Sequence, residues 1–123
     1  MTILALTLSV LLAIVALGAG LPKALLTGKI PAQLQSPGGL SAALVRFIGL
    51  AEVAAAGGLI AGLFWRPIGI AAAAGFAVLL IGAVIFHAKA GDYSDATTRG
   101  SAMAPIVLTV VAGLAVAALT VTA

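Results

Sequence analysis

Residues Ala42–Phe64 read AALVRFIGLAEVAAAGGLIAGLF, an apolar run long enough to cross a bilayer that nevertheless contains Arg46 and Glu52. A charged side chain at mid-bilayer costs about 3 kcal/mol even on the mildest scales. The whole chain has only six Lys or Arg and three Asp or Glu side chains, and two of them lie in this run. We therefore expect both charged groups to turn inward, where other helices shield them from lipid.

The composition of the remaining chain supports this interpretation. Of the 123 residues, 63% are hydrophobic and 7% are charged, and the mean hydropathy is +1.32. A soluble domain has about 25% charged residues. Four apolar runs with short connections predict an integral membrane protein of the all-α class. We expect an antiparallel, up-and-down bundle of four transmembrane helices in a single domain, 1–123.

The four spans are expected at residues 3–21, 42–64, 67–87 and 103–120. Pro22 is expected to end the first span, which we take as a retained helix rather than a cleaved signal because it lacks a basic start. The connection 27–41 contains glycines and prolines but has an apolar side, which predicts a short interfacial helix between the first two spans. Ser101 is a candidate N-cap of the last span.

Basic residues indicate the orientation of the bundle. Lys23, Lys29, Lys89 and Arg99 fall on one side of the membrane, whereas Arg66 falls on the other. Because cytoplasmic loops are enriched in Lys and Arg, we expect a multi-pass protein of the plasma (inner) membrane with cytoplasmic 1–2 and 3–4 loops and extracytoplasmic termini. The net charge of +3 is scattered over single positions, so it does not indicate nucleic-acid binding.

Arg46 and Glu52 are six residues apart and project about 120° from each other, too far for an ion pair within one helix. Arg46 is either an anchor that reaches the interface or a ligand contact. Glu52 either forms a structural hydrogen bond, with Ser9 or Thr7 as donors, or contacts a ligand. For Thr7 and Ser9 themselves, hydroxyl bonds to carbonyls of their own helix are the simplest expectation.

Counting residues along the spans converts positions to depths. Glu52 falls roughly 15 Å into its span, level with Leu80 and with Ser9–Leu11. Arg46 falls nearer the surface, level with His87 and Lys23. These levels predict a ligand-binding site formed by Arg46, Glu52, His87 and Lys23, although an isolated interfacial histidine is a simpler interpretation of His87. The chain has no cysteine and one histidine, so the residues predict no metal site and no catalytic group and favour a protein that is not an enzyme.

Several motifs give the chain a family resemblance. They are Gly20 with Lys23, the run RFIGLAE (Arg46 to Glu52), Gly58 with Leu59, the run HAKAGD (His87 to Asp92), and Pro105. In this order and spacing the chain resembles the DoxX-like family of small four-helix membrane proteins. The resemblance implies a four-helix fold. Because members include a quinone-linked membrane enzyme as well as accessory proteins, the resemblance makes a quinone one candidate ligand or cofactor, which the sequence leaves unknown.

Three functions remain open from the sequence. The first is an accessory protein that binds a quinone or a membrane lipid in its polar pocket. The second is a small proton-coupled transporter that uses Glu52. The third is a subunit that docks in a larger membrane complex or forms a homo-oligomer through the small-residue ridge of Gly58 and Gly62.

Overall fold

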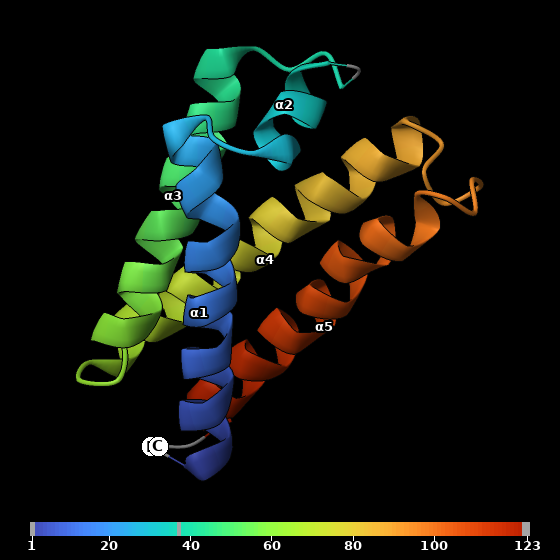
Figure 1. Ribbon diagram of the computed structural model, residues 1–123. Helices are drawn as coiled ribbons and strands as arrows, with labels where there is room; N and C mark the ends of the chain where they lie inside the picture. Colours follow the sequence, from blue (N-terminus) through green and yellow to red (C-terminus); the bar gives the residue numbers. More distant parts are fainter. Residues whose placement is uncertain (1, 37, 122–123) are drawn as a thin grey trace.

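The computed structural model describes residues 2–36 and 38–121, which form four long helices and one short helix. The long helices are α1 (Ile3–Leu25), α3 (Ala42–Ala61), α4 (Arg66–Lys89) and α5 (Arg99–Val121), and the short helix is α2 (Lys29–Gln35). Each long helix has the length and hydropathy needed to cross a membrane. The expected all-α bundle of four transmembrane helices is confirmed, and a short helix lies between its first two spans (Figure 1).

The end of α1 differs from the expected one. The helix continues through Pro22 to Leu25, because a proline so close to the end removes little of the hydrogen-bond ladder. The next two backbone N–H groups close the helix: Leu26 N–H donates to the Lys23 carbonyl and Thr27 N–H to the Pro22 carbonyl. This pattern is a Schellman-type end. Pro22 therefore lies in the last turn of the first span instead of ending it.

The other boundaries shift for similar local reasons. α3 ends at Ala61 because the turn to α4 already begins there. α5 begins at Arg99, so Ser101 is inside the helix and is not its N-cap. Two other caps are present: Thr2 Oγ1 accepts from Ala5 N–H at the start of α1, and Ser41 Oγ accepts from Leu44 N–H at the start of α3.

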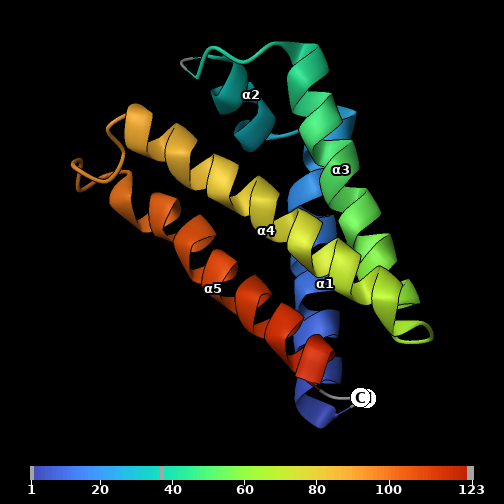
Figure 2. The ribbon, with the colours of Figure 1, turned by 180° about the vertical axis from the view of Figure 1, so that it is seen from behind.

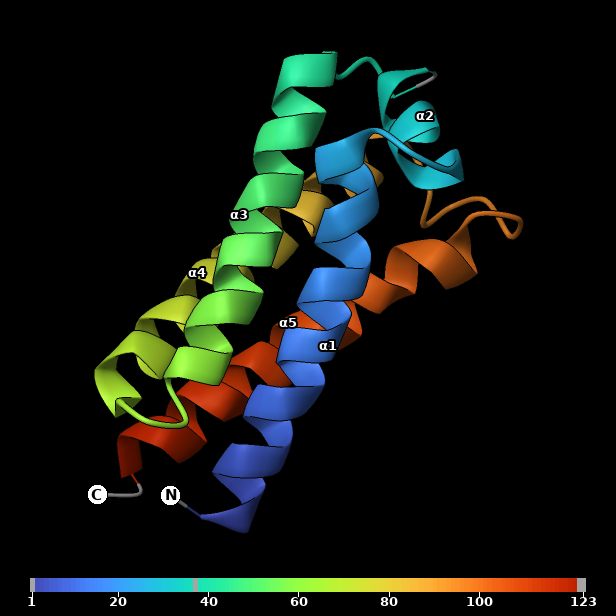
Figure 3. The ribbon, with the colours of Figure 1, turned by 60° about the vertical axis from the view of Figure 1, so that its left-hand side comes forward.

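The helices form two antiparallel pairs, α1 with α3 and α4 with α5, joined by the tight turn between α3 and α4. Figures 1 and 2 show the pairs diverging towards the end of the bundle that carries α2. The first residues of α1 and the last of α5 meet at the opposite end, where Ala5 packs against Leu119 (Figure 3). Between the two ends lies one apolar core to which all four long helices contribute, with Leu12, Leu59, Phe76, Leu80 and Ala112 among its members.

The small-residue ridge of α3 lies inside the bundle. A Cβ placed on Gly58 would lie 2.7 Å from Ala72 Cβ, and one placed on Gly62 would lie 2.7 Å from the Gly69 nitrogen. Both partners belong to α4, so the ridge lets α3 and α4 approach closely at their hairpin. The ridge is therefore occupied by α4 of the same chain, and docking in a larger complex or a homo-oligomer stays a prediction.

The outer surface of the bundle is apolar. Several large apolar side chains are more than half exposed, among them Ile14 (65%), Phe47 (65%), Leu50 (59%) and Val78 (69%). A water-soluble protein rarely exposes so continuous an apolar surface. In a bilayer these side chains face acyl chains, which agrees with four spans buried only in part against one another.

Candidate functional site

The principal polar contact of the spans is an ion pair between α1 and α3. Lys23 Nζ donates to Glu52 Oε1 over 2.6 Å. The Glu52 side chain is 6% exposed and the Lys23 side chain 15% exposed. Lys23 lies in the last turn of α1, where the helix dipole also favours a cation. The pair therefore places opposite charges together at the α2 end of the bundle, largely out of contact with lipid.

Two glycines bring the backbones close enough for this pair. A Cβ placed on Gly20 would lie 2.7 Å from both Glu52 Cβ and the Gly49 carbonyl oxygen. A Cβ placed on Gly49 would lie 2.6 Å from the Gly20 carbonyl oxygen and 2.7 Å from Lys23 Cβ. Such distances are shorter than any ordinary carbon contact. Only glycine fits at both positions, and the contact fixes how α1 and α3 are aligned along their axes.

This alignment differs from the one expected by counting residues. Glu52 was expected level with Ser9–Leu11, but it lies beside Gly20 and bonds Lys23, at the C-terminal end of the first span. The depth argument assumed that the ends of the spans lie level. In the structure α3 extends past the end of α1 at the α2 end of the bundle (Figures 1 and 3). The donor to Glu52 is consequently an ammonium, and neither Ser9 nor Thr7.

The environment of Ser9 also differs from the one expected from the sequence. Its Oγ is buried and has no hydrogen-bond partner in the described part of the chain, so the expected bond to a carbonyl of α1 is absent. Ser9 itself is 1% exposed and belongs to the face of α1 that includes Ala5 and Leu12. A buried hydroxyl without a partner is unfavourable.

Arg46 does not turn inward. It is exposed, one turn before Leu50 and on the same side of α3, and Leu50 is itself 59% exposed. The expectation that both charges of this span face the bundle is thus right for Glu52 and wrong for Arg46. A long side chain near the start of a span can extend its guanidinium to the interface. Its position agrees with the anchoring role, the alternative that the sequence left open.

His87 belongs to a different cluster, at the α4–α5 turn. Its Nδ1 lies 2.6 Å from Asp92 Oδ2, and its ring makes an edge contact with the Tyr93 ring. The Tyr93 hydroxyl donates to the Ala102 carbonyl, which connects the turn to α5. Within residues 2–36 and 38–121, no hydrogen bond or ion pair joins His87 to Lys23, Arg46 or Glu52. Of the four expected site residues, direct contact unites only Lys23 and Glu52.

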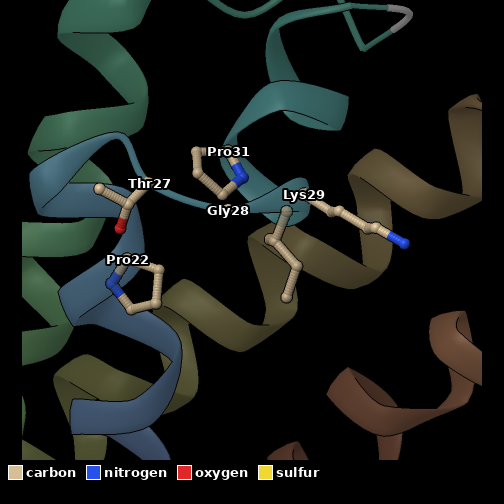
Figure 4. Close-up of a pocket in the computed structure, with 6 residues that line it drawn as sticks. Pro22, Thr27, Gly28, Lys29 and Pro31 are labelled. Atoms are coloured by element: carbon tan, nitrogen blue, oxygen red, sulfur yellow. The ribbon is translucent and has the colours of Figure 1, made fainter.

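A shallow pocket lies where α1 turns into α2, and neither Lys23 nor Glu52 lines it. It has a volume of about 450 Å³ and is lined by Pro22, Thr27, Gly28, Lys29, Ile30 and Pro31. In Figure 4 the Pro22 ring belongs to α1 and the Pro31 ring to α2, while the Lys29 side chain extends away from α1. These lining residues were not expected from the sequence. The signal was indirect, because the pocket depends on the left-handed backbone of Leu26 (φ 52°) and on Gly28 (φ 88°).

Comparison with known proteins identifies the family of the chain. The model of the DoxX-like family matches residues 7–115, which include the ion pair, both interhelical glycines and His87. Neither a curated protein nor a solved structure matches the chain. The match covers most of the four apolar helices and confirms the resemblance seen in the sequence. The chain is an integral, multi-pass membrane protein and belongs to the DoxX-like family.

Proposed function

We propose that this protein is an accessory, non-catalytic protein that binds a small amphipathic molecule, a quinone or a lipid, with the polar head at Lys23 and Glu52. The observation that carries the proposal is the ion pair at the end of an otherwise apolar bundle. A charged pair is a costly way of holding two membrane helices together, and ionisable groups within spans commonly serve function.

The pair has hydrogen-bonding capacity left for a ligand. An ammonium carries three donors, and the Lys23 ammonium uses one of them in the described structure, for Glu52 Oε1. With 15% of its side chain exposed, Lys23 can offer the others to a carbonyl or an anionic oxygen. Glu52 would then keep the ammonium charged and correctly directed. An apolar tail would lie along the lipid-facing helices.

The residues of the chain favour binding over catalysis. Without cysteine, the chain lacks the thiolates that hold an iron–sulfur cluster, and its one histidine is bonded to Asp92. In this proposal Arg46 anchors α3 at the interface and His87 orders the α4–α5 turn. Redox chemistry on a bound quinone would have to be carried out by another protein.

The proposal includes an orientation. Lys23, Lys29 and Lys89 lie at or near the α2 end of the long helices, and Arg99 begins α5 there, whereas Arg66 begins α4 at the other end. By the enrichment of basic residues in cytoplasmic loops, the α2 end faces the cytoplasm and both termini lie outside, in the plasma membrane.

Mass spectrometry of co-purified molecules tests the binding function. The protein is purified in mild detergent as the wild type, as the neutral double variant Lys23→Gln/Glu52→Gln, and as the control Arg46→Gln. We expect a lipid or quinone to be retained by the wild type and by the control and to be depleted in the double variant. Circular dichroism shows whether each variant keeps its helices. Identical quinone and lipid contents in three folded proteins would exclude a site at the pair.

A proton-coupled transporter is a second candidate, because Glu52 is buried, at 5% exposed, and contacts a cationic partner. Protonation of this carboxyl could alternate with pairing to Lys23. Proteoliposomes with an imposed pH gradient discriminate the two functions. Substrate-dependent proton movement that is lost in Glu52→Gln would favour transport over the binding function.

A further inference from the structure

The pocket between α1 and α2 has an apolar interior with polar groups at its edge. Pro22, Ile30 and Pro31 supply the apolar part, and Pro31 is fully buried, so it anchors α2 against the bundle. Thr27 and Lys29 supply a hydroxyl and an ammonium. The pocket is shallow, with a volume of about 450 Å³, and most of its lining residues are exposed, so a bound molecule would remain partly open to the membrane surface.

The Lys29 ammonium has no acidic partner among residues 2–36 and 38–121. All three acidic residues of the chain are engaged elsewhere in the described structure: Glu52 with Lys23, Asp92 with His87, and Asp95 with Thr97. Neither the Lys29 ammonium nor the Thr27 hydroxyl bonds another described residue. The exposed Lys29 ammonium is therefore available to an anion from outside the described residues.

The position of the pocket indicates which anion reaches it. It adjoins the last turn of α1, where a membrane-crossing helix gives way to the connection to α2 (Figure 4). Lipid phosphates lie at this level of a bilayer, and their glycerol and upper acyl carbons require apolar walls. The backbone that shapes the pocket is also fixed, because the Leu26 and Thr27 N–H groups are bonded to carbonyls of α1.

We propose that the pocket formed by Pro22, Thr27, Lys29, Ile30 and Pro31 binds the headgroup of an acidic phospholipid, with Lys29 contacting the phosphate. The site is separate from the Lys23–Glu52 pair, so it does not rest on the function proposed above. A bound acidic lipid would hold α2 at the membrane surface and supply a negative charge that no described residue supplies to Lys29.

Native mass spectrometry tests this site. The full chain is released from nanodiscs of mixed phosphatidylglycerol and phosphatidylcholine, and the retained lipids are counted for the wild type, Lys29→Gln, Lys29→Arg and Lys89→Gln. Lys89 is the matched control, because it is an exposed lysine at the same end of the bundle, outside the pocket. We expect the wild type, Lys29→Arg and Lys89→Gln each to retain one bound lipid, with phosphatidylglycerol about five-fold more abundant than phosphatidylcholine among the retained lipids. In Lys29→Gln this preference should be lost.

Three results would overturn the proposal: no preference in the wild type, an unchanged preference in Lys29→Gln, or equal losses in Lys29→Gln and Lys89→Gln, which would indicate diffuse attraction. The double variant Lys23→Gln/Glu52→Gln separates this site from the ion pair. It is expected to keep the phosphatidylglycerol preference even where it loses the ligand of the pair, and loss of that preference also counts against a separate site.

Discussion

Substitution of Gly49 by alanine tests how the structure creates the ion pair. The added Cβ would lie 2.7 Å from Lys23 Cβ, and an ordinary carbon contact is about 3.5 Å, so α1 and α3 must separate by about 0.8 Å. The same displacement lengthens the 2.6 Å bond between Lys23 Nζ and Glu52 Oε1 to about 3.4 Å, beyond a good hydrogen bond. Both changes should therefore weaken the packing of α1 against α3.

The expected loss is about 2–3 kcal/mol in the free energy of unfolding. Overpacking alone costs about 1–3 kcal/mol, and the weakened ion pair brings the loss towards the upper end. Gly57→Ala is the matched control, since it lies on the same helix with no atom within 4 Å of its added Cβ. That variant should be neutral or stabilised by up to about 1 kcal/mol, because alanine is a better helix former than glycine.

Titration with sodium dodecyl sulfate, followed by circular dichroism, measures both variants in the same mixed micelles. Wild-type stability in Gly49→Ala would refute the close approach of α1 and α3 at this point. An equal loss in Gly57→Ala would show that the cost arises from glycine replacement in α3 generally and not from the contact with α1.

Three further predictions concern the connections. Leu26 adopts a left-handed conformation (φ 52°), which is unfavourable for leucine, so Leu26→Gly should raise the free energy of unfolding by about 1 kcal/mol; a decrease would contradict this. Asp92→Ala removes the hydrogen-bond partner of His87. Because a partly exposed charged hydrogen bond contributes about 1 kcal/mol, amide hydrogen exchange in residues 90–98 should accelerate about five-fold. Unchanged exchange would show that the bond does not order the turn. Hydrogen bonds from the backbone N–H and then the hydroxyl of Thr97 hold the pKa of the Asp95 carboxyl below its ordinary value of 3.8. Because the pKa is lower in the folded loop, the contribution of Asp95 to loop stability is present above about pH 4 and is lost as the pH falls through the folded pKa. A titration midpoint of the Asp95 carboxyl at or above 3.8, measured by NMR, would contradict the last prediction.

The sequence predicted the class and the spans because hydropathy and helix length follow from local composition. Four apolar runs with short connections allow few arrangements other than an up-and-down bundle. The ends of the spans were less accurate, since they depend on capping. Pro22, for example, is accommodated in the last turn of α1 because the next two N–H groups satisfy the final carbonyls.

The partner of Glu52 was not predictable by counting depths. The axial alignment of α1 and α3 is set by the contact between Gly20 and Gly49, a tertiary feature that residue counts along each span do not contain. The family motif nevertheless held the relevant residues, because it includes Gly20, Lys23, Gly49 and Glu52. With hindsight, glycines at the same level as a buried carboxylate indicate which helix supplies its partner.

The inward direction of Arg46 was the least secure expectation, for a physical reason. A guanidinium on a long side chain near the end of a span reaches water from almost any face of the helix, so hydropathy does not fix its direction. A carboxylate on a shorter side chain in the middle of α3 lacks that freedom. Glu52 accordingly faces α1, whereas Arg46 is exposed.

A double-mutant cycle on Lys23 and Glu52 tests the central structural claim most directly. The free energy of unfolding is measured for the wild type, Lys23→Gln, Glu52→Gln and the double variant. If the two side chains pair across α1 and α3, each single variant leaves a largely buried charge without its partner, and the double variant is less destabilised than the sum of the singles by at least about 1 kcal/mol. Additive losses, with a coupling of zero, would show that the carboxylate and the ammonium do not interact.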